Sequence, residues 1–164
     1  MPIRDATEAD LTAIVAIYNA AIPGRLATAD TEPITVESRF KWFKEHTPHG
    51  YPLWVMEMNH QVIGWLSFQP FYGRPAYHST AEVSIYVAPE FQHRGVGKQL
   101  LQQAIAYSPA IEINTLLGFV FAHNEPSLKL FEKFNFSEWG YLPRVAELDG
   151  IERDLAILGL RIQF

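Results

Sequence analysis

The chain contains no cysteine among its 164 residues. Disulfide bonds, thiolate metal sites and a cysteine nucleophile are therefore excluded. The six histidines do not show a metal-binding spacing such as His-x-x-x-His, so they do not resemble a ligand set. We expect a protein without a metal centre.

The sequence also lacks an excess of basic charge and a long apolar run. Its formal net charge is −5, whereas nucleic acids and anionic membranes bind basic surfaces. No apolar stretch approaches the roughly 20 residues that span a bilayer, and the N-terminal residues do not form the apolar core of a signal peptide. We therefore expect a cytoplasmic protein with neither nucleic acid nor membrane as a partner.

The composition that is present fits an ordinary globular domain. Apolar residues make up 48% of the chain and charged residues 19%, and a chain of this length can bury a full hydrophobic core. The sequence contains no internal repeat, low-complexity tract or linker. It predicts a single domain over residues 1–164.

Four segments have the apolar spacing of helices. The first follows a capping box formed by Thr7 and Asp10, a typical helix start. The second is expected to bury Val36, Phe40 and Phe43. Pro126 lies in the first turn of the last one, where proline is tolerated. The predicted helices cover residues 11–21, about 36–47, 96–107 and 126–134.

Shorter segments with period-two or continuous apolar patterns predict strands. The segment 113–121 is apolar on both faces, as expected for a strand covered on each side. The predicted strands cover residues 3–4, 53–58, 62–68, 81–87, 113–121, 136–141 and 151–162. Together, the patterns predict an α/β domain with a mixed central sheet of about six to seven strands flanked by about four helices.

The segment Gln92-His-Arg-Gly-Val-Gly97 lies between a predicted strand and a predicted helix. Its glycines let the backbone turn closely and leave N–H groups unobstructed at the positive end of the helix, which is a phosphate-binding arrangement. Arg94 adds a suitable charge. The P-loop and dinucleotide patterns do not fit, because Gln99 and Leu100 replace the required Ser/Thr and glycine. Taken alone, the segment also fits an ordinary strand–turn–helix connection.

A second motif, Asn124-Glu-Pro-Ser-Leu-Lys-Leu-Phe-Glu-Lys-Phe-Asn-Phe136, follows downstream. With the glycine segment, it resembles the GNAT superfamily of N-acetyltransferases, whose motifs are Gln/Arg-x-x-Gly-x-Gly/Ala and Asn-x-x-Ser-x-x-x-Tyr-x-x-x-Gly-Phe. The resemblance extends over nearly the whole chain and implies acetyl-CoA as co-substrate. The contacts that it implies are Val87, Gln92, His93, Arg94, Gly95, Val96, Gly97, Lys98, Asn124 and Ser127.

Two positions differ from the family pattern. Phe131 occupies the place where many relatives carry a tyrosine that protonates the departing thiolate, so that role has no obvious holder. Asn135 replaces the usual glycine after the helix, a mild change because asparagine tolerates the left-handed conformation.

Glu82 is the candidate general base. On the predicted strand 81–87, Glu82 alternates with the apolar Ala81 and Val83 and so points to the opposite face. A glutamate is more often a solvated or salt-bridged carboxylate. Here, however, it precedes the cofactor segment on the same strand, and a carboxylate can take the proton that an ammonium must lose before it attacks a thioester.

Within the superfamily, the chain resembles the phosphinothricin acetyltransferase branch. The resemblance is carried by Arg74-Pro-Ala-Tyr77 before the strand and by Gly150-Ile-Glu-Arg-Asp154 near the end. It implies acetylation of the α-amine of phosphinothricin, methionine sulfoximine or methionine sulfone, with Arg74 and Tyr77 holding the acceptor's carboxylate. It also implies a homodimer. Arg153 stands where relatives often carry histidine.

Two other functions remain compatible with the sequence. The same donor could serve a protein N-terminus or a lysine as acceptor. Alternatively, the chain could be a non-catalytic acyl-CoA-binding module, a reading that the phenylalanine at position 131 supports. Release of free thiol from acetyl-CoA in the presence of candidate amines distinguishes these functions.

Overall fold

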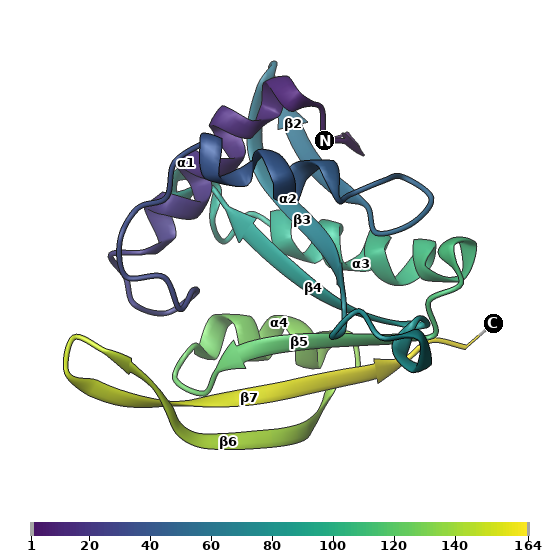
Figure 1. The fold of residues 1–164 in the computed structure, drawn as a ribbon. Helices are drawn as coiled ribbons and strands as arrows, with labels where there is room; N and C mark the ends of the chain where they lie inside the picture. The colour runs from purple at the N-terminus through teal and green to yellow at the C-terminus, as the bar shows by residue number, and fades with distance from the viewer. Residues whose placement is uncertain (1, 164) are drawn as a thin grey trace.

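A computed structural model describes residues 2–163. Within that range, seven strands form one mixed sheet in the order β1-β2-β3-β4-β5-β7-β6 (Figure 1). The strands are β1 Ile3–Asp5, β2 Leu53–Met58, β3 Gln61–Pro70, β4 Thr80–Val87, β5 Thr115–Phe121, β6 Ser137–Leu148 and β7 Ile151–Arg161. Neighbouring strands are antiparallel except for β4 and β5, which are parallel. The predicted fold class is confirmed.

Four helices cover the sheet of the described chain, two on each face (Figure 1). They are α1 Leu11–Ala21, α2 Phe40–Lys44, α3 Val96–Tyr107 and α4 Glu125–Lys133. Strand β2 is buried on both sides: Val55 packs with α1, whereas Met56 packs with α3 on the opposite face. The continuous apolar pattern of this strand therefore reflects helices on both faces.

Two elements differ from the sequence prediction. The second helix is only five residues long and follows a 3₁₀ turn. Because such a short helix turns one side to the sheet, Trp42 and Phe43 pack inward and Phe40 is 40% exposed; the expected burial of Phe40 is wrong. Strand β6 continues well past residue 141, across Pro143 and a register shift. Both features are tolerated because β6 is an edge strand.

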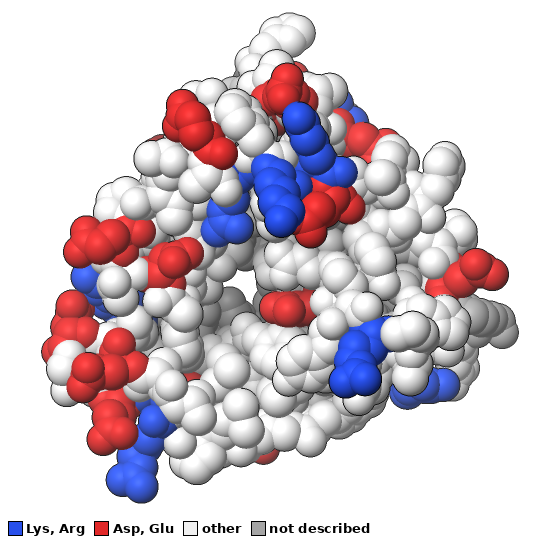
Figure 2. Space-filling model, in the orientation of Figure 1, with Lys and Arg blue, Asp and Glu red and all other residues white. Residues whose placement is uncertain are grey.

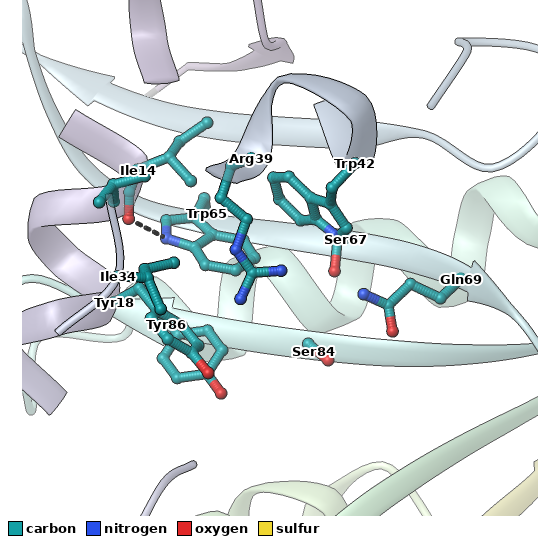
Figure 3. A pocket seen from close by; sticks show the side chains of 11 residues that line it. Ile14, Tyr18, Ile34, Arg39, Trp42, Trp65, Ser67, Gln69, Ser84 and Tyr86 are labelled. Atoms are coloured by element: carbon teal, nitrogen blue, oxygen red, sulfur yellow. Dashed lines mark hydrogen bonds between the residues drawn. The ribbon is translucent and has the colours of Figure 1, made fainter. Parts of the chain in front are cut away.

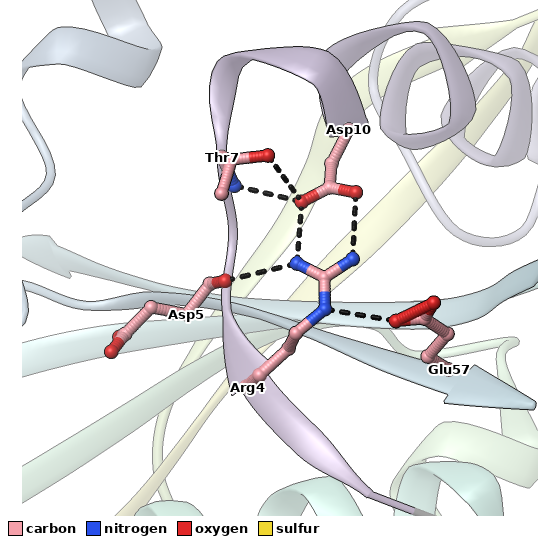
Figure 4. A network of polar contacts seen from close by, with 5 residues as sticks. All are labelled: Arg4, Asp5, Thr7, Asp10 and Glu57. Carbon is pink, nitrogen blue, oxygen red and sulfur yellow. Dashed lines mark hydrogen bonds and ion pairs between the residues drawn. The ribbon is translucent and has the colours of Figure 1, made fainter. Parts of the chain in front are cut away.

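The N-terminal strand is tied to the first helix by a charged network (Figure 4). The guanidinium of Arg4 donates to both carboxylate oxygens of Asp10, at 2.7 and 2.9 Å, and to Glu57 at 2.9 Å. The backbone N–H of Thr7 also donates to Asp10, which confirms the predicted capping box. These hydrogen bonds, above all those from Arg4, hold the pKa of Asp10 below its usual range.

The sheet opens between β4 and β5. Their parallel ladder contains only the pairs Thr80–Thr115, Ala81–Leu116 and Glu82–Leu117, after which the strands diverge (Figure 1). On their other sides, β4 stays paired with β3 and β5 with β7 along their lengths. The result is a V-shaped slot whose closed end is the Glu82–Leu117 pair.

Candidate active site

Glu82 lies at the closed end of the slot. It pairs with Gln69 of β3 on one side and with Leu117 of β5 on the other. Its side chain is half-buried, and within residues 2–163 it forms neither an ion pair nor a side-chain hydrogen bond. Burial therefore raises the pKa of this carboxyl, since no cation offsets the lost hydration. A half-buried carboxylate without a partner among the described residues is unlike the salt-bridged surface glutamate that the sequence left open.

A pocket of about 130 Å³ lies on the same face as Glu82, under α1 and α2. Figure 2 shows a hollow on this side of the molecule, with an acidic side chain on its wall. The pocket is lined by Ile14, Val15, Tyr18, Ile34, Arg39, Trp42, Trp65, Ser67, Gln69, Ser84 and Tyr86 (Figure 3). The predicted alternation of β4 is confirmed, because Ser84 and Tyr86 line this pocket while Val83 packs in the core on the other face.

The aromatic wall of the pocket is fixed by its own contacts. The rings of Trp65 and Tyr86 stack at 4.8 Å. The indole of Trp65 donates to the carbonyl of Ile14 at 3.1 Å, and the hydroxyl of Tyr86 donates to the carbonyl of Ala27 at 3.1 Å. These contacts tie α1 and the loop after it to the central strands. They fix the position of the aromatic wall relative to the sheet.

The glycine segment forms the start of α3 at the end of β4. Gly95 is the N-cap in the left-handed region, with φ of 82°, and His93 has φ of 63°. No side chain of the described residues caps the helix, so its first N–H groups are free to meet an anion. A Cβ at Gly97 would lie 3.3 Å from Leu130, which shows how closely α3 approaches α4. This backbone suits a pyrophosphate.

The other side chains of the glycine segment are either buried in the core or exposed to solvent. Val96 is buried in the core and anchors the segment, whereas Gln92, His93 and Lys98 are exposed. Arg94 is also exposed, and its guanidinium lies 5.3 Å from the ring of Phe91. The exposed side chains are accordingly free to contact a ligand over the helix start.

Asn124 begins α4 at the end of β5, on the other side of the slot. Its side-chain carbonyl accepts from the backbone N–H of Ser127 at 3.3 Å, and its amide donates to the carbonyl of Leu26 at 3.2 Å. Asn124 is 6% exposed, so both polar groups are engaged inside the protein. Asn124 thus fixes the first turn of α4, on which the half-buried Ser127 lies.

Phe131 belongs to the hydrophobic core. It is 5% exposed and packs edge-on against Phe136 at 4.9 Å. A Cβ at Gly118 of β5 would lie only 2.8 Å from its ring, so the ring fills the space beneath that strand. The position offers no proton donor.

Arg74 and Tyr77 lie in the exposed loop between β3 and β4. Tyr77 contacts Phe71, whose ring in turn stacks at 6.5 Å on Phe119 of β5. Arg74 is exposed and forms no ion pair within the described chain. The loop therefore presents an aromatic group and a free guanidinium next to the start of β4.

Sequence reasoning missed the pocket residues Arg39 and Trp42. Arg39 is held between Tyr18 and Trp42, with its guanidinium carbon 5.2 and 5.3 Å from the two ring centres. Arg39 and Trp42 are three residues apart, a spacing that places two side chains on the same side of a helix. This spacing was the sequence signal by which they could have been found. Whether these two side chains point into the pocket depends on how α2 packs against the sheet.

The model of the acetyltransferase (GNAT) family matches residues 13–136, and the chain belongs to that family. It is 53% identical over 97% of its length to YwnH of Bacillus subtilis, provisionally named a phosphinothricin acetyltransferase, and covers 98% of it. It is 32% identical to the L-methionine sulfoximine/L-methionine sulfone acetyltransferase of Pseudomonas aeruginosa, over 98% of this chain and 94% of that one.

Among solved structures, the chain resembles a GNAT superfamily phosphinothricin acetyltransferase from Sinorhizobium meliloti, determined in complex with acetyl-CoA. The TM-score is 0.92 at 27% identity, over 98% of this chain and 88% of that one. The resemblance to the phosphinothricin acetyltransferase branch is thereby confirmed. Within residues 2–163, no group of His, Asp and Glu could hold a metal ion, and no helix is both long and apolar enough to cross a membrane.

Proposed function

We propose that the protein transfers the acetyl group of acetyl-CoA to the α-amine of a small amino-acid-like acceptor of the phosphinothricin, methionine sulfoximine or methionine sulfone type. One observation carries this proposal. The β4–β5 ladder ends at Glu82, so a half-buried, unpaired carboxylate faces the point where the slot begins. The Pseudomonas aeruginosa relative and the Sinorhizobium meliloti structure are both named for acceptors of this type.

The chain's own residues would bind the donor at the open end of the slot. The backbone amides of Gly95, Val96, Gly97 and Lys98 would hold the pyrophosphate, with the side chains of Gln92, His93 and Arg94 around it. Ser127 would contact the donor from the first turn of α4, which Asn124 caps. Both helices follow the diverging strands, so their N-termini suit one ligand lying between them.

Glu82 would take the proton of the acceptor amine, directly or through a water. The freed nitrogen attacks the thioester carbonyl and the C–N bond forms. The C–S bond then breaks, and the proton that the nitrogen loses on becoming an amide passes through water to the departing thiolate, so that coenzyme A leaves as the free thiol. Because burial raises the pKa of Glu82, its carboxylate is a stronger base than an exposed glutamate. The backbone N–H of Val87, beyond the end of the ladder, would polarise the carbonyl oxygen.

Arg74 and Tyr77 would recognise the carboxylate of the acceptor. Both are exposed in the loop that leads into β4, and Arg74 has no protein partner among the described residues. A free guanidinium can form two parallel hydrogen bonds to a carboxylate. This contact would favour a free amino acid over a peptide, in which that carboxylate is an amide.

We also propose that the protein is a homodimer. We propose the cytoplasm as its compartment, because acetyl-CoA, its proposed donor, is found there. The edge strand β6 and the start of β7 carry large exposed apolar side chains, namely Trp139, Tyr141, Leu142, Val145 and Ile151. Exposed apolar side chains gathered at one edge of a sheet are typical of a subunit interface. Light scattering after gel filtration should give twice the mass of the chain, and Val145→Glu should shift it to the monomer mass.

The experiment for the proposed reaction measures free thiol released from acetyl-CoA with a panel of amines. The panel contains phosphinothricin, methionine sulfoximine, methionine sulfone, methionine, a peptide with a free N-terminus and a lysine peptide. We expect release with the amino-acid analogues. Release with peptides alone would support a protein acetyltransferase. Tight binding of acetyl-CoA by calorimetry without release on any amine would support a non-catalytic acyl-CoA-binding module.

A further inference from the structure

The inner wall of the pocket collects hydrogen-bond donors that the protein itself does not use. The indole nitrogen of Trp42 and the hydroxyl of Ser67 are both buried, and neither has a hydrogen-bond partner within residues 2–163. Ser67 is fully buried on β3. Buried polar atoms without partners are rare in proteins and costly to leave unpaired. Their presence in one pocket indicates a ligand.

Two further donors face the same space. Figure 3 shows the guanidinium of Arg39 and the amide of Gln69 turned toward Trp42 and Ser67. Arg39 has 27% of its side chain exposed, and its ion pair with Asp30 is long, at 3.9 Å. Most of its N–H groups therefore remain free to bind a ligand. The four groups can together donate to a compact group with more than one acceptor oxygen.

The position of these donors relative to Glu82 defines which part of an acceptor they meet. Glu82 pairs with Gln69, and Ser84 pairs with Ser67 one repeat further along the same two strands. That repeat is two residues, or about 7 Å along a strand. The loop with Arg74 lies at the opposite end of β4, before Thr80. An acceptor with its amine at Glu82 thus has its side chain directed into the pocket.

We propose that the pocket is a subsite for the end of the acceptor's side chain, and that it selects a tetrahedral sulfur or phosphorus centre bearing acceptor oxygens or nitrogens. The donors are Arg39, Trp42, Ser67 and Gln69. The two methylenes of a methionine or phosphinothricin side chain bridge the space between amine and head group. This inference rests on the proposed function and deepens it by naming the group that is recognised.

The same donors discriminate against plain methionine. A thioether is a weak hydrogen-bond acceptor, so binding of methionine would close the pocket over donors that stay unpaired. Sites built to hydrogen-bond a substrate reject analogues lacking the matching group far more strongly than apolar pockets reject a change in size. The pocket therefore selects for the oxidised sulfur of methionine sulfone over the thioether of methionine.

The test compares kcat/KM for methionine sulfone and for methionine in wild type and variants. Ser67→Ala removes one unpaired hydroxyl and should lower kcat/KM for the sulfone about 3- to 10-fold, the usual effect of one hydrogen bond. The value for methionine should not fall. Since this hydroxyl has no partner within residues 2–163, the thermal stability of the variant should stay the same or rise.

Arg39→Gln should reduce kcat/KM for the sulfone by more than tenfold while affecting methionine much less, because it removes the charged donor. Lys41→Gln is the matched control: it removes a positive charge two residues further on, in α2, at an exposed position outside the pocket, and it should change neither value.

Three results would overturn the subsite. Wild type could acetylate both acceptors equally well, Ser67→Ala could leave the sulfone value unchanged, or the variants could lower both values by the same factor. Each of these outcomes would leave the proposed acetyl transfer intact, since an amino acid would still be acetylated. Failure to release thiol with any amino acid would instead overturn the proposed function, and the subsite with it.

Discussion

Glu82 and Leu117 form the last pair of the ladder between β4 and β5, and the two strands separate immediately beyond them. The carboxylate of Glu82 therefore lies at the closed end of a slot whose open end is flanked by the starts of α3 and α4. Donor and acceptor can thus approach one carboxylate from different sides.

Glu82→Gln should lower turnover about 10²- to 10⁴-fold, the usual contribution of a general base. The affinity for acetyl-CoA, measured by calorimetry, should change little. Burial disfavours the ionised carboxyl, so this group costs folding stability once pH rises above its unfolded pKa. The glutamine variant should accordingly unfold at neutral pH with no lower free energy than wild type. Near-normal turnover would rule out the base role.

The pH dependence of kcat/KM should show the ionisation of the Glu82 carboxyl. Because the pKa of this carboxyl is raised, wild-type activity should fall with decreasing pH at a midpoint above that of an ordinary glutamate, about 4.3. Glu82→Gln should lose this acidic limb. A limb that persists unchanged in the variant would assign the titration to another group.

Gly95→Val and Gly97→Val should weaken acetyl-CoA binding sharply, since a side chain would block the approach of the pyrophosphate to the backbone. The structure adds separate reasons: Gly95 has a positive φ, and a Cβ at Gly97 would press on Leu130. Gly150→Val is the matched control, because Gly150 has a similar φ of 79° in the β6–β7 turn. Unchanged affinity in a folded variant of either loop glycine would refute the assignment.

Arg74→Ala should raise KM for methionine sulfone and leave KM for acetyl-CoA near normal. Loss of one partner of an engaged charged pair typically costs a few kcal/mol. Arg74→Lys should rescue only part of the loss, because an ammonium cannot reproduce two parallel hydrogen bonds. If wild type acetylates methionine sulfone and its carboxamide equally well, no cation recognises the carboxylate.

Asp10→Asn should lower the free energy of unfolding at neutral pH by about 1–3 kcal/mol, since hydrogen bonds to a charged group are lost. The pKa of Asp10 is lowered in the folded protein. Its stabilisation is therefore fully present above the unfolded pKa of about 3.9 and is lost as pH falls through the folded value. Urea titrations at neutral and acidic pH should show the gap between wild type and variant closing in acid. A constant gap would contradict the linkage.

The sequence predicted what depends on local pattern. The alternation of β4, the capping box at Thr7 and the glycine turn at Gly95 are set by neighbouring residues, and all three are found where they were expected. The slot could not be predicted, because the point at which β4 and β5 part depends on pairing across a long crossover through α3. The pocket donors Arg39 and Trp42 were missed for a similar reason. Their side chains point into the pocket because of how a short helix packs on the sheet, and that packing is not a local pattern.

The most direct test of the account is mass spectrometry of the product formed from acetyl-CoA and methionine sulfone. We expect the α-amine of the acceptor to carry the acetyl group, with one free thiol released for each product molecule. Glu82→Gln should bind acetyl-CoA normally and form this product at least a hundredfold more slowly, the lower end of a general-base contribution of about 10²–10⁴. Full binding of acetyl-CoA by wild type without any acetylated acceptor would contradict the account.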